Sequence, residues 1–350
     1  MAKLRLMRAV LVALMCAVLL AAMWGRADLY AQERAVAEKT SPLVLTGSIP
    51  LPNVQGRIDH MSIDPKGRLF VSALGNNSEE VVDLSAGMRS RSISGIPRPQ
   101  GVVYCAEVNK LFVGSDEGKL YIYDASTFDL ISSIEYGDDV DNLRYDAAKK
   151  QVFVGYGSGE TGAIGVLDAI TNQRLPKEFK LGAHPESFQL ESAGPNIYVN
   201  VPDLKQIAVI NRNTGAISRW RIAFDSNFPM ALDESGHRLF VATRSPARLL
   251  VFDTTSGHMI SALPCVQGSD DMFFDAARKR IYITGGEGYI HVFQQDNGER
   301  YHLAAKISSG LGARTAGYFG KGRKGFDLFY VAVPARANSP AEVLIYTVQN

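Results

Sequence analysis

The chain has 350 residues and a formal net charge of +1, and 46% of its residues are hydrophobic while 21% are charged. A chain of this length and composition can bury a sizeable core without a cofactor to hold it together. Its near-neutral charge argues against nucleic acid or an anionic membrane surface as the main partner.

The first thirty residues have the layout of a secretory leader. Three basic residues precede an unbroken apolar run over residues 9–24, and Leu29-Tyr30-Ala31 is the best small-residue cleavage site. We therefore predict a signal peptide over residues 1–31 and a periplasmic or secreted protein that meets the membrane only through its leader before cleavage. The alternative is an uncleaved anchor, for which the run is short compared with the roughly 20 apolar residues of a membrane span.

Seven copies of an aliphatic-aromatic-aliphatic motif recur along most of the chain, each preceded by an acidic residue or its substitute and a short turn. Their central aromatics lie 41 to 48 residues apart, at Phe70, Phe112, Phe153, Tyr198, Phe240, Tyr282 and Tyr330. A period of about 40–45 residues with alternating apolar positions is typical of four-stranded propeller blades, whereas helical repeats would show apolar residues at i, i+3 and i+4. The sequence therefore predicts an all-β, seven-bladed β-propeller with four-stranded antiparallel blades.

A second marker follows six of the motifs, namely an apolar residue and then an acidic or amide residue at the head of a turn. These turn residues are Asp83, Asp124, Asp168, Asn211, Asp253 and Gln294. An Asp or Asn side chain at such a position can accept hydrogen bonds from backbone N–H groups of the turn that follows. We expect these turns to end the third strand of each blade.

The two ends of the chain predict how the ring closes. Residues 32–41 predict a flexible lead-in, and residues 43–50 then resemble the last strand of a repeat. The C-terminal repeat stops after a third strand at residues 342–348. We expect the N-terminal strand to complete the C-terminal blade, which makes residues 42–350 one propeller and removes exposed sheet edges.

The repeats resemble the YVTN-repeat, YncE-like family of bacterial exported seven-bladed propellers over essentially residues 42–349. The resemblance rests on second-strand cores with small followers, such as Tyr198-Val-Asn-Val201 and Tyr282-Ile-Thr-Gly285, and on the Asp-headed turns. It implies an exported propeller, which we expect to be a monomer. The wider superfamily resembles lactonase-type propellers and the propeller subunits of quinoprotein dehydrogenases, but a shared fold does not imply a shared activity.

One column of the aligned repeats marks where each innermost strand begins, and it reads Asp59, Gln100, Asp141, Glu186, Phe228, Asp270 and Arg314. The innermost strands of a propeller surround one channel, so equivalent positions form a ring. The next column and a nearby loop add further polar residues. We therefore predict a polar channel mouth made of Asp59, His60, Gln100, Asp141, Asn142, His184, Glu186, Asp270, Asp271 and Arg314.

This polar mouth allows three interpretations. The polar residues could simply face water, with Arg314 balancing neighbouring acids. They could bind a small molecule or another exported protein, because converging carboxylates repel one another unless a cation, a shared proton or an arginine relieves them. They could also hold Ca²⁺, which prefers oxygen ligands, through Asp59, Asp141, Glu186 and Asp270. A binding module is our primary expectation, and Ca²⁺ is a candidate rather than a required cofactor.

The resemblance to lactonase-type propellers implies an enzymatic alternative, since those proteins hold an ion in the channel that can polarise a lactone carbonyl. In this chain Asn142 would join the four acids as a ligand, and His60 or His184 would be the base. A weaker alternative, by analogy to the quinoprotein relatives, is an accessory subunit of a periplasmic redox complex. The absence of GxSxG, HExxH, CxxC and CxxCH strings removes the usual serine hydrolase, zinc protease, thioredoxin and c-type haem interpretations.

Other sequence features receive structural interpretations. Residues 157–162 match GxGxxG, but no helix is expected after them, so they predict a hairpin loop and not a nucleotide site. Cys105 and Cys265 fall in different repeats on apolar strands, which favours two buried free thiols over a disulfide. The longer loop at residues 334–340 and the basic segment 320–325 are solvated turns or, alternatively, docking surfaces.

Overall fold

The computed structural model describes residues 41–320 and 327–350. The predicted signal peptide, and the predicted lead-in up to residue 40, lie outside the described residues. The chain divides into a small unit, residues 1–44 with 349, and a large unit, residues 45–348 with 350, which contains the blades described below. In the part of the chain that is described, no helix is both long and apolar enough to cross a membrane.

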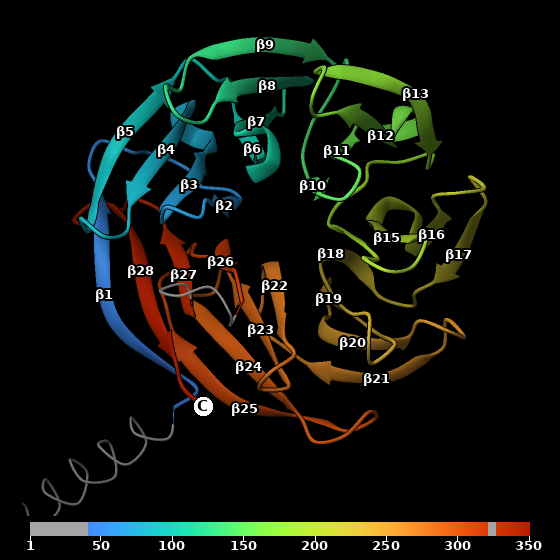
Figure 1. Cartoon of the computed structure of the whole chain (residues 1–350). Helices are drawn as coiled ribbons and strands as arrows, with labels where there is room; N and C mark the ends of the chain where they lie inside the picture. The colour runs from blue at the N-terminus through green and yellow to red at the C-terminus, as the bar shows by residue number, and fades with distance from the viewer. Residues whose placement is uncertain (1–40, 321–326) are drawn as a thin grey trace, which may run out of the picture. The chain divides into compact units, whose positions relative to one another are not determined.

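Seven four-stranded antiparallel sheets are arranged in a ring around a central channel, which confirms the predicted propeller (Figure 1). From the channel outward, blade one contains β2 (Met61–Ile63), β3 (Arg68–Ala73), β4 (Ser78–Asp83) and β5 (Met88–Ser94). Blade two contains β6 (Pro99–Cys105), β7 (Lys110–Ser115), β8 (Lys119–Asp124) and β9 (Leu130–Glu135). Blade three contains β10 (Leu143–Asp146), β11 (Gln151–Tyr156), β12 (Ala163–Asp168) and β13 (Gln173–Lys180).

The next three blades repeat this arrangement. Blade four contains β14 (Phe188–Leu190), β15 (Asn196–Val201), β16 (Gln206–Asn211) and β17 (Ile217–Arg221). Blade five contains β18 (Asp225–Asp233), β19 (Arg238–Ser245), β20 (Ala247–Asp253) and β21 (Met259–Pro264). Blade six contains β22 (Ser269–Asp275), β23 (Arg280–Gly285), β24 (Tyr289–Gln295) and β25 (Tyr301–Ser308). Four 3-10 turns, η1 (Leu74–Asn76), η2 (Ala106–Val108), η3 (Gly159–Thr161) and η4 (Pro202–Leu204), lie between strands.

The seventh blade is composite. Its inner strands are β26 (Ala316–Tyr318), β27 (Leu328–Val333) and β28 (Ala341–Val348), and β1 (Leu43–Leu51) pairs outside β28. The prediction that an N-terminal strand completes the C-terminal blade is therefore confirmed. Of the basic segment 320–325, only Gly320 lies among the described residues.

One register joins the two innermost strands of all seven blades. The paired residues are Met61 with Val71, Val102 with Val113, Leu143 with Val154, Phe188 with Val199, Met230 with Val241, Met272 with Ile283, and Ala316 with Val331. Each second-strand partner is the last residue of the aliphatic-aromatic-aliphatic motif. Because the register is constant, residues of one alignment column lie at one level of the channel.

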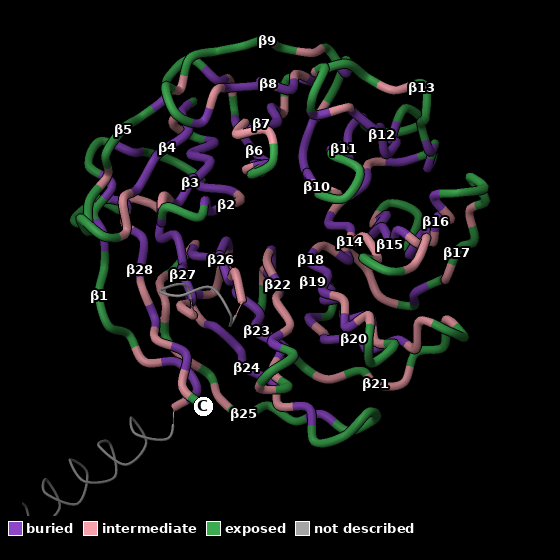
Figure 2. Tube along the Cα trace, viewed as in Figure 1, coloured by how far each residue is buried: buried purple, intermediate pink, exposed green. Residues whose placement is uncertain are grey.

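The core lies within and between the blades. The seven central aromatics of the motif are all at most 3% exposed, and the third strands are buried as well, whereas the outermost strands carry most of the exposed positions (Figure 2). Burying an aromatic side chain is worth roughly 1.5–3 kcal/mol relative to leaving it exposed. The repeated motif therefore contributes a buried aromatic side chain to every blade.

Five of the six predicted turn residues accept two backbone N–H groups from the turn that follows. Asp83, Asp124, Asp168, Asn211 and Asp253 each bond the N–H groups two and three residues later. The prediction is wrong for Gln294, whose amide donates to the backbone carbonyls of Arg278 and Lys279. In that blade the turn begins later, and Asn297 is the acceptor.

Two further predictions are confirmed. Residues 157–162 connect strands β11 and β12 and contain only the short turn η3, so they form a hairpin connection. Cys105 and Cys265 are free and buried. Burial raises the pKa of the Cys265 thiol to about 12 and that of Cys105 further, which keeps both in the unreactive thiol form.

Candidate functional site

The central channel contains two chambers, one toward each end of the innermost strands. We call the first the mouth chamber, a cavity of about 260 Å³ at the start of these strands. Its lining is almost entirely polar and consists of Arg57, Arg98, Gln100, Asp116, Asp139, Asp141, His184, Glu186, Phe228, Arg244 and Asp270. Five of the seven residues of the predicted column are in this lining.

His184 also lines the mouth chamber, whereas the other predicted residues lie elsewhere. Asp59 and Asn142 are each only 1% exposed and lie outside the lining of both chambers, while His60 and Asp271 line the second chamber. The Arg314 guanidinium lies against Gly286 and forms no ion pair with any described residue. The interpretation in which Arg314 balances neighbouring acids is therefore not supported by an ion pair of Arg314 among the described residues.

Other arginines balance the acids of the mouth chamber. Arg57 Nη2 lies 2.9 Å from Asp59 Oδ2 and 3.7 Å from Asp270 Oδ2. Arg244 forms a short ion pair with Asp270 and stacks over the Phe228 ring, with 3.6 Å between Cζ and the ring centroid. Sequence reasoning missed both arginines because they lie outside the aligned column, Arg57 in the connection before β2 and Arg244 near the end of β19.

Asp141 lies between two imidazoles. Its Oδ1 is 3.6 Å from His60 Nε2, and its Oδ2 is 3.8 Å from His184 Nε2. On the far side of each ring there is another carboxylate: His60 Nδ1 is 3.3 Å from Asp271 Oδ1, and His184 Nδ1 is 3.4 Å from Asp139 Oδ2. His184 Nδ1 also lies 2.7 Å from the carbonyl oxygen of Gly157. These alternating acids and imidazoles connect the two chambers.

The flanking carboxylates keep both imidazoles charged. Burial alone would lower the pKa of His184, but its contacts with Asp141 and Asp139 outweigh burial and raise the pKa to about 10. The pKa of His60 is raised well above its ordinary value by Asp271 and Asp141, again against burial. At neutral pH an imidazolium holds its proton, so neither histidine is in the state that a general base requires.

Glu186 is the unpartnered acid of the mouth chamber. Its carboxylate forms no hydrogen bond or ion pair with any residue that the structure describes, although His184 and Asp141 are close. Burial, and then repulsion from Asp141, raise the pKa of Glu186 to about 8. Deeper in the channel, Asp59 Oδ1 and Asn142 Oδ1 are also buried without a hydrogen-bond partner among described residues. Such groups cost free energy unless a ligand or water satisfies them.

The donor atoms do not suit the Ca²⁺ predicted from the sequence. Asp59 and Asp270 are already paired with arginines, which leaves Asp141 and Glu186 of the four predicted ligands. Asp141, His184 and Glu186 offer one ligand atom each, all within 4.8 Å of one another. Ca²⁺ prefers six to eight oxygens, whereas an imidazole with two carboxylates is a set that suits a transition metal such as Zn²⁺. A metal here would have to displace the His184 proton.

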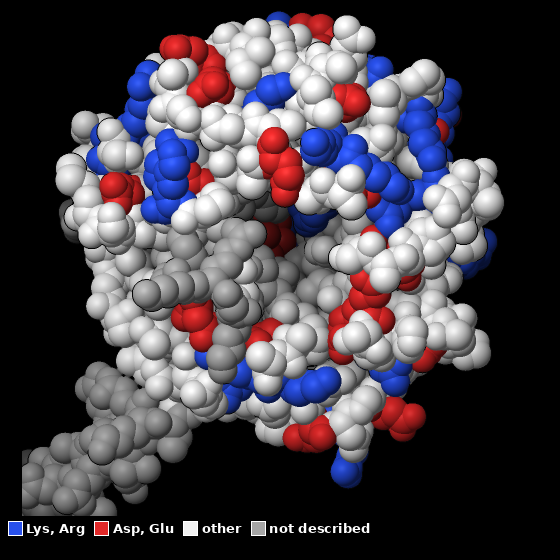
Figure 3. All heavy atoms as spheres, in the orientation of Figure 1, with Lys and Arg blue, Asp and Glu red and all other residues white. Residues whose placement is uncertain are grey.

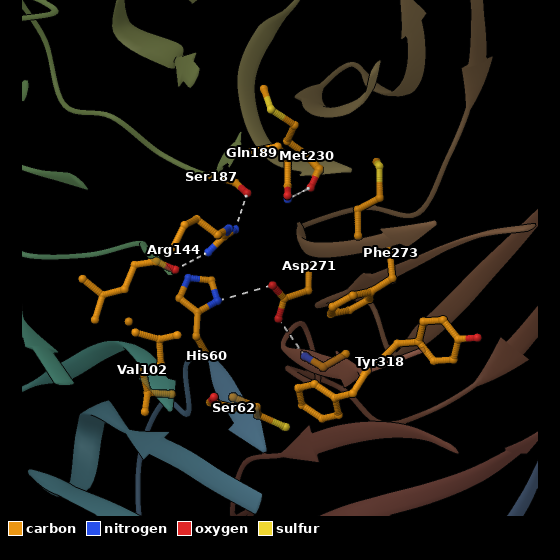
Figure 4. A pocket seen from close by; sticks show the side chains of 17 residues that line it. His60, Ser62, Val102, Arg144, Ser187, Gln189, Met230, Asp271, Phe273 and Tyr318 are labelled. Atoms are coloured by element: carbon orange, nitrogen blue, oxygen red, sulfur yellow. Dashed lines mark hydrogen bonds and ion pairs between the residues drawn. The ribbon is translucent and has the colours of Figure 1, made fainter. Parts of the chain in front are cut away.

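We call the second cavity the basal chamber. It has a volume of about 360 Å³ and opens beyond His60 and Asp271, toward the other end of the innermost strands (Figure 4). Its walls combine a few polar residues with many apolar ones, among them Arg144, Ser187, Gln189, Met61, Val102, Met230, Met272, Phe273, Tyr318 and Phe319. Figure 3 shows the molecule hollowed at the centre of the ring, with acidic side chains visible at depth.

Neither this second chamber nor a role for Arg144 was predicted from the sequence. Arg144 lies one residue after Leu143 on β10, and both residues line the chamber. The signal that could have found Arg144 was a single basic residue in the first strand of one repeat.

No protein-family model matches this chain, and no curated protein matches it in sequence. Solved structures match its fold. The WD40 repeats of RRP9 superpose with a TM-score of 0.73 at 10% identity, covering 87% of this chain and 97% of that one. A chain of the Mitotic Checkpoint Complex gives 0.72 at 11%, covering 87% and 92%, and a chain of Kuenenia stuttgartiensis Hydrazine Synthase gives 0.70 at 16%, covering 85% and 97%. At these identities the likeness establishes a seven-bladed, WD40-like propeller fold and nothing about activity.

Proposed function

We propose that this protein is an exported, YncE-like propeller that binds a small polar ligand in its mouth chamber. The leader-like residues 1–31 support export, and the repeat pattern supports the YncE-like assignment. Export would appear as a mature protein whose N-terminus begins after Ala31 and which fractionates with the periplasm or medium.

The observation that carries the binding proposal is the unpartnered carboxyl group of Glu186, which a bound cation would favour in its ionised form. The chamber is rich in charge, yet Asp59, Asp139, Asp141 and Asp270 all have cationic neighbours within 4.0 Å. Glu186 alone among these acids has no partner in the described structure. A ligand that brings an ammonium or other N–H donor would supply that partner, and charge-assisted bonds of this kind contribute about 1.5–3 kcal/mol.

Calorimetric titration of the purified protein with ethanolamine, arginine and spermidine, at a pH above about 8 where the Glu186 carboxylate is ionised, tests this proposal. We expect at least one of these cations to bind, and Glu186→Gln to weaken its binding by about tenfold or more, since the charge-assisted bond is lost. Glu160→Gln is the matched control, because Glu160 is exposed in the loop that joins β11 and β12. Equal binding by wild type and Glu186→Gln, or binding of none of the three, would contradict the proposal.

A metal-dependent hydrolase is the second candidate, and the convergence of Asp141, His184 and Glu186 favours it. These residues would hold a transition metal, which when bound can act as a Lewis acid on a lactone carbonyl. Lactone hydrolysis that depends on added Zn²⁺ or Mn²⁺, and that is lost in His184→Gln, would support this candidate. The absence of metal-dependent thermal stabilisation would remove it.

A protein partner is a further possibility that the fold permits. The structural neighbours named above include a chain of the Mitotic Checkpoint Complex and a chain of an enzyme, hydrazine synthase. Because those likenesses are of fold alone, an accessory role in a periplasmic redox complex stays a proposal. A stable partner recovered by co-purification from the periplasm of the native host would support it.

A further inference from the structure

We propose that the basal chamber is a second binding site, separate from the mouth chamber, and that it takes a small organic anion with an apolar body, held by Arg144. The inference does not rest on the function proposed for the mouth chamber. It rests on the cavity, on the unpaired guanidinium that faces it, and on the apolar side chains around that guanidinium.

Arg144 has unused hydrogen-bonding capacity inside the cavity. Its Nη1 donates to the Leu143 carbonyl oxygen at 2.8 Å, and its Nη2 donates to Ser187 Oγ at 3.3 Å. A guanidinium has five N–H groups, and Arg144 forms no ion pair with any residue in the described part of the chain. Figure 4 shows the guanidinium directed into the space framed by Ser187, Met230, Phe273 and His60.

The other charged groups of the basal chamber do not neutralise Arg144. Asp271 is occupied on both oxygens, by His60 Nδ1 at 3.3 Å and by the Ala316 N–H at 2.8 Å. His60 and Asp271 thus form a pair of opposite charge, and Arg144 contributes an uncompensated positive charge to the cavity. Burial lowers the pKa of Arg144, and attraction from Asp271 and Asp141 offsets this only in part. The chamber therefore favours an anion.

The walls of the basal chamber indicate the chemistry of the part of the ligand that does not contact Arg144. Met230 and Met272 are nearly fully buried, and Met61, Phe273 and Phe319 complete an apolar surface around the cavity. Small-molecule sites are typically mostly apolar cavities of roughly 300–1,000 Å³ with a few converging polar groups. Arg144 and the Ser187 hydroxyl provide those groups here, and a planar guanidinium matches a carboxylate in two parallel bonds. A carboxylate with a short alkyl or aryl body fits this chemistry.

The test is a titration of the full protein with hexanoate, hexanol and hexylamine, which share an apolar body and differ in charge. We expect hexanoate to bind, and hexanol and hexylamine to bind at least tenfold more weakly, because a charge-assisted bond contributes more than a neutral one. Arg144→Gln should weaken hexanoate about tenfold or more, and Arg144→Lys should restore only part of the affinity, because lysine lacks the bidentate geometry.

Two control variants locate the binding. Arg221→Gln removes an exposed arginine of β17 and should leave hexanoate affinity unchanged, as should Glu186→Gln in the mouth chamber. The proposal is overturned if hexanoate fails to bind at millimolar concentration, if hexanol binds equally well, or if Arg144→Gln binds like wild type. Loss of hexanoate binding in Glu186→Gln but not in Arg144→Gln would place the anion in the mouth chamber instead.

Discussion

Among single side chains, Asp141 has the most consequential position, because it contacts both His60 and His184 and so connects two cavities with different chemistry. Favourable charge contacts hold the pKa of Asp141 well below its usual range despite its burial. Asp141 is therefore ionised throughout the physiological range, and the two imidazolium rings are its counterions. Removing either ring leaves a buried carboxylate with less compensation.

This arrangement predicts a particular pH dependence for His184→Gln. Because the pKa of His184 is about 10 in the folded protein and about 6.5 in the unfolded chain, folding favours the protonated ring. The resulting stabilisation is fully present below about pH 6.5 and is lost as the pH rises through about 10. We expect His184→Gln to lower the free energy of unfolding by at least about 1 kcal/mol at pH 6, and by much less above pH 10.

Thermal unfolding of wild type and variant at several pH values measures this difference. His302→Gln is the control, since His302 is 54% exposed and paired with an exposed Asp296. Its effect should be small at every pH, because exposed ion pairs contribute little. A His184→Gln difference that stays constant from pH 6 to pH 11 would show that His184 is not held as an imidazolium.

Among the structural elements, the turns after the third strands show how a single Asp or Asn at the head of a turn stabilises that turn by accepting its backbone N–H groups. The Asp168 carboxylate accepts the N–H groups of Ile170 and Thr171, at 2.8 Å each. We expect Asp168→Ala to destabilise the protein by about 1 kcal/mol, because two turn N–H groups lose their acceptor. Asp168→Asn keeps an acceptor oxygen and should cost less. Urea unfolding of both variants checks the order, and an Asn variant as unstable as the Ala variant would contradict this role.

The elements that the sequence predicted well are those in which one local signal decides the structure. The aliphatic-aromatic-aliphatic motif predicted seven second strands, and Gln100, Asp141 and Glu186 of one aligned column all line the mouth chamber. The prediction for Gln294 is wrong because blade six has a longer turn. Asn297, and not the residue at the aligned position, accepts the hydrogen bonds from the backbone N–H groups of that turn. Periodicity predicts strands better than it predicts turn length.

The site was predictable only in outline for a related reason. Arg57, Asp139 and Arg244 lie in connections or at strand ends, and Asp139 has a positive φ of 36°. Where such side chains point depends on the path of each loop, which alternation along a strand does not describe. The sequence therefore indicated which acids converge, but not which arginines pair with them. It offered Arg314 as the cation that balances these acids, whereas Arg57 and Arg244 form the ion pairs.

For the large unit as a whole, stability depends on closing the ring through β1. Leu51 on this strand is fully buried, whereas Leu45 on the same strand is 55% exposed. We expect Leu51→Ala to lower the free energy of unfolding by about 2–5 kcal/mol, and Leu45→Ala to change it by no more than about 0.5 kcal/mol. Equal effects in chemical denaturation would mean that β1 contributes little to the seventh blade.

The pairing of β1 with β28 also has a consequence for the order of events during biosynthesis. Thr46 Oγ1 on β1 bonds the Ile345 carbonyl oxygen, a partner 299 positions later in the chain. On the ribosome, Thr46 is made 299 residues before Ile345, so the seventh sheet has to wait until β28 has been synthesised. Contacts this distant in sequence make folding slow. A nascent chain stalled before residue 341 would have its first strand without a partner, open to chaperones, proteases or a neighbouring chain.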